Sequence, residues 1–212
     1  CSNITSSIPS DPIPASGTGC TSFQTLFGGC SNLSDTIPTG IFNKHTSVSS
    51  FGFTSTFAGC TSLTGSIPSG LFDIHTSVSI FGFTGTFQNC SGLTGDIPSG
   101  LFDNNTQVSM WGFFTTFSGC SGLTGTIPSG LFDNNTLVSS NGFNQTFSFC
   151  SGLTGNIPVG LFDNNTNVTT NAFSGTFWGC SGLTGKNPAG ILPVKPEQPH
   201  KVPLKALVVT LV

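Results

Sequence analysis

The stretch CSGLTGTIPSGLFDNNTLVSSNGFNQTFSF, residues 120–149, decides the fold, because close copies of it occur on both sides with no insertion between them. The cysteine that begins the stretch recurs every 30 residues. A fixed period over consecutive copies is typical of a solenoid, in which each copy forms one coil stacked on the last. The equivalent cysteines are Cys30, Cys60, Cys90, Cys120, Cys150 and Cys180.

Within each copy, certain positions stay apolar while Ser, Thr, Gly and Asn lie between them. No helical period is long enough for a stable helix, so the pattern predicts short extended segments joined by turns, with one helical or 3₁₀ turn after Ser129. One coil alone cannot bury its large side chains, and stacking makes a continuous core. The sequence therefore predicts a β-rich solenoid. The expected core positions are Leu123, Ile127, Leu131, Phe132, Val138, Phe143, Phe147 and their equivalents.

The array divides the chain into four parts. Residues 1–29 read as a degenerate N-terminal coil or cap, and residues 30–190 form the repeats. Residues 191–203 are a proline-rich linker, which is stiff and extended. Residues 204–212 form an apolar β segment, and the first residue, Cys1, suggests a processed product or a fragment.

The composition excludes several classes of function. Only 6% of the residues are charged, the formal net charge is −3, and Arg and Tyr are absent. Without a basic stripe a nucleic-acid role is not expected, and without a run of 18 apolar residues no membrane span is expected. We expect a surface wetted by hydroxyl groups, amides and covalent sugars.

The repeated cysteines predict a ladder of buried, reduced thiols. Their side chains point the same way from successive coils, which does not favour disulfides between adjacent rungs, although the spacing would permit them. Cys1 and Cys20 stand apart from the ladder, and we expect a capping disulfide between them. Lipid modification of Cys1 is the alternative.

One segment carries a family resemblance. The stretch FDNNTNVTTNAFSGTFWGCSGLTG, residues 162–185, resembles the leucine-rich repeats of bacterial surface proteins, the BspA-like group and its relatives with 26-residue surface repeats. The shared core is Phe-x-x-Cys-x-x-Leu, as in Phe147, Cys150 and Leu153, and the likeness covers about residues 30–190. The 30-residue period and the use of Phe in place of Leu or Met depart from the family. The resemblance implies a leucine-rich-repeat-like fold, secretion or surface display, and adhesion or matrix roles without catalysis.

Asn-x-Ser/Thr sequons are the richest functional signal. Asn104, Asn134 and Asn164 stand in one column, which predicts a row of glycosylation sites along one edge. The alternative is that an Asn- and Thr-rich chain makes sequons by chance and that this motif forms a turn. The remaining candidates are Asn3, Asn32, Asn144 and Asn167, with Asn89 the weakest because Cys90 is its middle residue.

Other polar columns predict less. The carboxylates Asp73, Asp103, Asp133 and Asp163 are expected to cap turns in solvent rather than to bind metal. His45 and His75 are expected in turns, and His200 shows no catalytic setting, so neither an enzymatic activity nor a cofactor is expected. A threonine column could order water as in ice-binding solenoids. Its members are Thr56, Thr86, Thr116, Thr146 and Thr176.

The C-terminal segment suggests self-association. It could insert as a strand into a neighbouring subunit, begin a following domain, or fold back on its own solenoid. We expect the first arrangement, strand addition to a neighbour. The apolar residues that would pair are Leu204, Leu207, Val208, Val209, Leu211 and Val212.

Three functions remain open after this reading. The first is a non-enzymatic structural or adhesive protein, secreted or on the cell surface, with the further expectation of a fibre subunit. The second is a leucine-rich-repeat module that recognises a protein or glycan, for which Met110, Trp111, Phe114 and Trp178 are candidates, although Trp111 falls in a column that reads as core. The third is ice binding.

Overall fold

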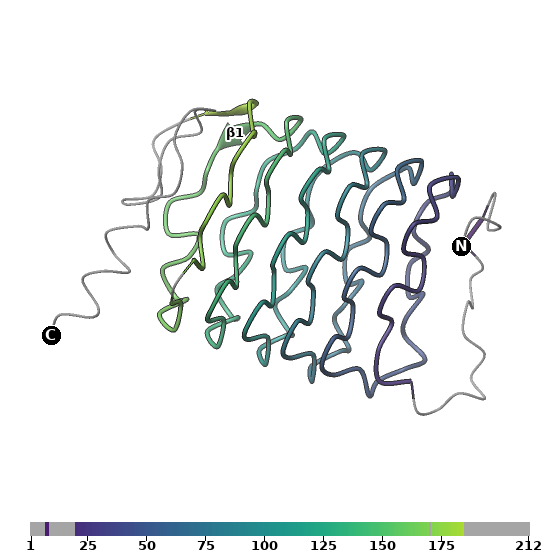
Figure 1. The fold of residues 1–212 in the computed structure, drawn as a ribbon, viewed down its shortest axis with the longest axis horizontal. Helices are drawn as coiled ribbons and strands as arrows, with labels where there is room; N and C mark the ends of the chain where they lie inside the picture. The colour runs from purple at the N-terminus through teal and green to yellow at the C-terminus, as the bar shows by residue number, and fades with distance from the viewer. Residues whose placement is uncertain (1–6, 9–19, 170, 185–212) are drawn as a thin grey trace, which may run out of the picture.

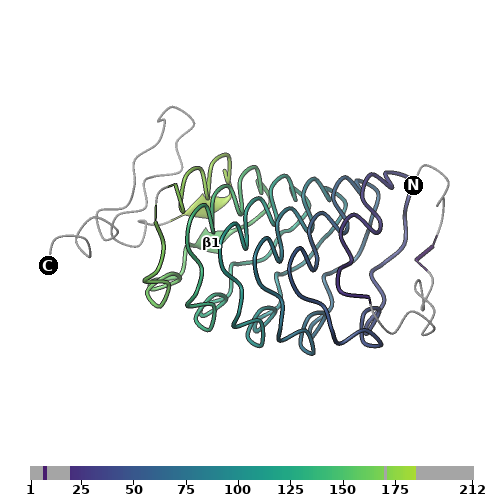
Figure 2. The same cartoon turned by 60° about the horizontal axis from the view of Figure 1, so that its bottom comes forward.

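The computed structural model describes residues 7–8, 20–169 and 171–184. These residues wind into coils that follow one another along a single axis, as expected for a repeat solenoid (Figure 1). Turning the molecule shows the corresponding loops of successive coils side by side in rows (Figure 2). None of the described residues forms a helix that could cross a lipid bilayer.

The expectation of a β-rich solenoid is wrong for the described residues. The named strands among them are β1 (Gly155–Asn156) and β2 (Leu183–Thr184), which pair in parallel with Gly155 opposite Leu183. Isolated parallel bridges join Thr36 to Thr64 and Gly95 to Leu123 in other coils. One side of the solenoid is thus joined by very short parallel contacts.

The opposite side consists of turns instead of strands. We call the segments 51–60, 81–90, 111–120, 141–150 and 171–180, with the first one at 21–30, the turn ribbons. Along each ribbon, alternate amides bond to the next coil and to the same coil: Phe53 N donates to Gly82 O (2.8 Å), whereas Thr54 N donates to Phe51 O (3.2 Å). Every second residue therefore closes a turn, while the residues between them hold the coils together.

Positive φ angles explain why these segments are not strands. In one ribbon, Phe51, Ser55 and Gly59 have φ of 56°, 52° and 76°, at intervals of four residues. Each is the third residue of a turn, where type II turns require positive φ, and an extended strand cannot accommodate it. The column that contains Gly59 carried a signal for this, because it holds Gly or Asn in most coils. The helical turn expected after Ser129 is likewise a simple turn, with Asp133 N donating to Gly130 O (3.0 Å).

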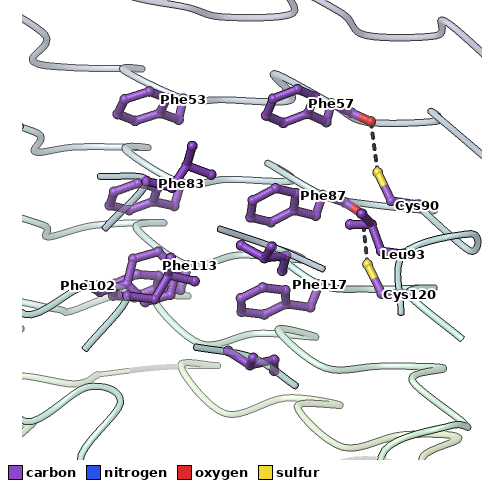
Figure 3. Packing of buried hydrophobic residues seen from close by; sticks show 14 of the residues in the cluster. Phe53, Phe57, Phe83, Phe87, Cys90, Leu93, Phe102, Phe113, Phe117 and Cys120 are labelled. Carbon is purple, nitrogen blue, oxygen red and sulfur yellow. Dashed lines mark hydrogen bonds between the residues drawn. The ribbon is translucent and has the colours of Figure 1, made fainter. Parts of the chain in front are cut away.

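Columns of phenylalanine form the core, as predicted. Phe83, Phe113 and Phe143 stack with ring centroids 5.7 and 5.6 Å apart, and Phe102 packs at 4.8 Å between two of these rings. Figure 3 shows two such columns running through successive coils. The expected core positions are confirmed as buried: Leu123, Ile127, Leu131, Phe132, Val138, Phe143 and Phe147.

Candidate functional site

Three columns of buried polar side chains run through the core, one each of Cys, Thr and Asn. A residue in any of them donates a hydrogen bond to the carbonyl of a Phe 33 positions earlier, as Cys90 does to Phe57 (3.0 Å) and Thr86 to Phe53 (2.9 Å). These bonds run opposite to the backbone bonds between ribbons, in which the earlier coil donates. The two directions together satisfy the polar groups that stacking buries.

The structure places Cys30, Cys60, Cys90, Cys120, Cys150 and Cys180 in the core without disulfide bonds. Burial raises the pKa of Cys60 and of Cys180 to about 12, and it raises the pKa of the Cys120 thiol well above its usual range. A thiolate is the reactive form of cysteine, so these residues act as small apolar groups with one weak donor. Cys20 is half-buried and donates to Ser22 O (3.2 Å), and its expected partner Cys1 lies outside the described residues.

We predict that the ladder thiols react slowly in the native protein. Burial keeps them protonated and covered, so labelling with a maleimide at pH 7 should proceed only as fast as the coils open. Denaturant should expose all six ladder thiols. Peptide mapping under non-reducing conditions provides the control, because disulfides between adjacent rungs would contradict the prediction.

The threonine column cannot order surface water as proposed from the sequence. Thr86, Thr116 and Thr146 are fully buried, and their hydroxyls donate to Phe53, Phe83 and Phe113. Thr56 and Thr176 make the equivalent bonds. The ice-binding hypothesis based on this column is therefore wrong, because the hydroxyls are already used inside the protein.

The asparagine column was not recognised in the sequence. The Asn135 side chain is fully buried and donates two hydrogen bonds, to Phe102 O and Asn105 O, both at 3.1 Å. Asn105 and Asn165 repeat this arrangement in their own coils. The sequence motif Asp-Asn-Asn-Thr thus holds one exposed Asn followed by one buried Asn, which adjacent identical letters conceal.

Histidine occupies the asparagine column in the two earlier coils, at His45 and His75. The expectation that both lie in turns misses that His75 is fully buried. Burial is the main cause that lowers the pKa of His75 below its ordinary value, so the folded protein favours the neutral ring. Below about pH 6.5 the unfolded chain binds a proton that the folded chain resists. The contribution of His75 to stability is therefore complete above that pH and is lost as the pH falls.

We predict that His75→Asn reduces the acid sensitivity of the fold. Asn in this column supplies two donors without titrating, as Asn105 shows one coil later. The melting temperatures of wild type and variant should be compared at pH 7.5 and pH 5.0. The wild type should lose more stability on acidification than the variant does, and equal losses would assign the acid sensitivity to other groups.

The exposed Asp column offers no metal centre within the described residues. Asp73, Asp103, Asp133 and Asp163 all lie at the surface. No group of three His, Cys, Asp or Glu side chains among the described residues is arranged to hold a metal ion. A surface depression lies beside two of these carboxylates, and its lining consists of Ser69, Gly70, Asp73, Ser99, Gly100, Asp103 and Asn104.

The sequon asparagines differ in accessibility. Asn104, Asn134 and Asn164 are exposed in one row, and each side-chain amide donates to the carbonyl of an Asp in the preceding coil, at 3.0–3.4 Å. Asn144 is half-buried and donates to Asn141 Oδ1 (3.2 Å). The other described sequons, at Asn32, Asn89 and Asn167, are exposed.

Aromatic side chains also lie at the surface, in the positive-φ column of the ribbons. We call Phe51, Phe81 and Trp111 the aromatic strip. Their φ angles are 56°, 55° and 57°, and their rings stack with centroids 4.9 and 5.9 Å apart. Phe51 is 40% exposed and the other two are half-buried, so the interpretation of Trp111 as core is only partly right. Bulky residues rarely adopt positive φ, so this column exposes aromatic rings in a strained backbone.

Other candidates lie close to the aromatic strip or beyond the described residues. Met110 is exposed, and Phe114 packs edge-on against Trp111 with centroids 4.7 Å apart. The exposed pair Phe149 and Trp178 was only half foreseen, because Phe149 occupies a column that holds Gly in other coils. The positions outside the described residues are Cys1, Asn3, His200 and residues 204–212.

Comparison with known proteins yields little beyond this geometry. No family model matches the chain, and no curated protein matches its sequence. One solved structure with similarity is the LRR ectodomain of the plant membrane receptor kinase GASSHO1/SCHENGEN3 from Arabidopsis thaliana, in complex with CASPARIAN STRIP INTEGRITY FACTOR 2. The identity is 14% and the TM-score 0.38, over 79% of this chain and 20% of that chain. The present chain thus spans about a fifth of the length of that ectodomain.

Proposed function

We propose that this chain is a non-enzymatic structural or adhesive repeat protein of the cell exterior, of leucine-rich-repeat type. The observation that carries the proposal is the continuity of the ladders. Phenylalanine stacking and inter-coil hydrogen bonds run without a break from the ribbon at 21–30 to the ribbon at 171–180. Such a body is a stiff spacer that displays the same surface groups at regular intervals.

Localisation provides the direct test of this role. Immunogold electron microscopy of the source cells should place the protein outside the plasma membrane or on the cell wall. Filaments that carry the label would support the fibre subunit that the sequence suggests. Label confined to the cell interior would overturn the proposal.

Covalent sugar on the sequon row belongs to the same proposal. The few charges in the chain and the exposure of Asn104, Asn134 and Asn164 support it. We predict that the intact mass of the native protein exceeds that of the polypeptide, and that Asn134→Gln removes one increment while Asn135, which is buried, carries none. A native mass equal to that of the bare chain would remove sugars from the proposal.

Recognition of a protein or glycan is the second candidate function, and the aromatic strip favours it. Asn141 and Asn171 occupy the same column in later coils, so Asn is compatible with its positive φ. The triple variant Phe51→Asn, Phe81→Asn, Trp111→Asn should therefore fold. We expect it to lose binding to immobilised glycans or secreted proteins that the wild type retains, and unchanged binding would exclude the strip.

The proposed structural role does not depend on how copies associate. Strand addition by residues 204–212 to a neighbouring subunit stays a prediction from the sequence, because these residues lie outside the described part of the chain. The BspA-like relationship likewise rests on the sequence resemblance. Both are finer statements than the repeat solenoid itself.

A further inference from the structure

The last turn ribbon ends the solenoid with a row of backbone donors. In the preceding ribbon, Phe143 N, Gln145 N and Phe147 N each donate to a carbonyl of the next coil at 2.9 Å. The equivalent amides one coil later have no acceptor among the residues that the structure describes. We call them the terminal edge, which consists of the amides of Phe173, Gly175, Phe177 and Gly179.

The core is also less covered at this end. Phe162, Val168 and Phe173 are half-buried, whereas the equivalent Phe132, Val138 and Phe143 are fully buried. Unpaired donors at alternate residues beside exposed aromatic surface resemble the edge of an unfinished sheet, and an edge of this kind accepts a further rung.

The register of the solenoid selects the residues that would complete it. Each inter-coil bond of the ribbons joins residue i to residue i+29, as in Phe143 to Ala172. Counted from the terminal edge, the acceptors are the carbonyls of residues 202, 204, 206 and 208. The chain from Thr184 to Val202 is as long as that from Thr154 to Ala172, so the same chain returns to this position without an insertion.

The side chains of this segment suit the columns they would extend. Pro203, Ala206 and Leu207 fall in the buried columns of Phe173, Thr176 and Phe177. Lys201 and Lys205 fall in columns that reach the surface, where their charges stay hydrated. Pro203 has no amide hydrogen, so a rung that contains it lacks one donor for any further coil.

We propose that residues 202–208 add a closing rung to the terminal edge of their own chain, with the carbonyls of Val202, Leu204, Ala206 and Val208 accepting the four open amides. This inference goes beyond the proposed function. It replaces the expected strand addition to a neighbour with closure of the same solenoid, because the spacer length already places the segment there.

Hydrogen exchange of the full chain tests the proposal at single amides. The amides of the terminal edge should be protected, and this protection should not change on dilution. Removing residues 201–212 should speed their exchange at least about tenfold, the loss expected for a net hydrogen bond and its cover. Removing residues 210–212 alone is the matched control and should leave them protected, while Phe113 in the middle of the solenoid reports that both variants stay folded.

Two outcomes would overturn the closing rung. If the terminal amides exchange equally fast with and without residues 201–212, the edge is open to solvent. If their protection falls as the protein is diluted, the segment comes from a second copy and the strand-addition arrangement holds instead.

Discussion

Replacing Phe113 by alanine should destabilise the protein by about 3–5 kcal/mol. Phe113 is fully buried and lies against four rings, with Phe83 and Phe143 at 5.7 and 5.6 Å and Phe102 and Phe132 at 4.8 Å. Its removal leaves a cavity that neighbours in a ladder cannot fill without disturbing their own columns. Because each coil contacts only its neighbours, the loss should also break the array into two weakly coupled halves.

Denaturant unfolding measures this effect, with Phe51→Ala as the matched control. Phe51 stacks on Phe81 but is 40% exposed, so its truncation should cost less than about 1 kcal/mol. The midpoint should fall far more for Phe113→Ala, and an additional shallow phase would indicate that the halves unfold separately. Equal midpoint shifts would show that the internal phenylalanine columns do not dominate stability.

Asn135→Asp should be the most damaging single-atom change in the chain. The side-chain amide donates to two carbonyls inside the core, and a carboxylate would turn two donors into acceptors that face those oxygens. A buried charge without a partner costs at least about 3 kcal/mol. Burial raises the folded-state pKa of the introduced carboxyl, so the loss should be smallest near pH 4 and should grow as the pH rises.

The neighbouring Asn134→Asp provides the control, since it makes the same change on an exposed side chain with one bond to Asp103 O. It should cost less than about 1 kcal/mol and show little added pH dependence. Melting temperatures of both variants relative to wild type, at pH 4 and pH 7, separate the two positions. If Asn134→Asp and Asn135→Asp behave alike, the asparagine column does not carry the role assigned to it.

The fold and its core were accessible from the sequence because they depend on the period. A repeat of 30 residues without insertions fixes which side chains share a column, and columns of Phe, Leu, Ile, Val and Cys must point inward in any stack that buries them. The core positions from Leu123 to Phe147 follow from this alone. The exposed Asn104, Asn134 and Asn164 likewise share a column for any path of the chain.

The turns, by contrast, were decided only in three dimensions. Phe51, Ser55 and Trp111 adopt positive φ although nothing in their local sequence favours it, because each then closes a turn whose flanking amides meet carbonyls 29 residues further on. The same stacking buries Thr86 and Asn135, which composition alone would place in solvent, since an unpaired Phe carbonyl bond in the preceding coil is available to them. Periodicity determines which residues are equivalent, whereas the choice between strand and turn, and between buried and exposed Asn, depends on backbone partners that exist only once the next coil is in place.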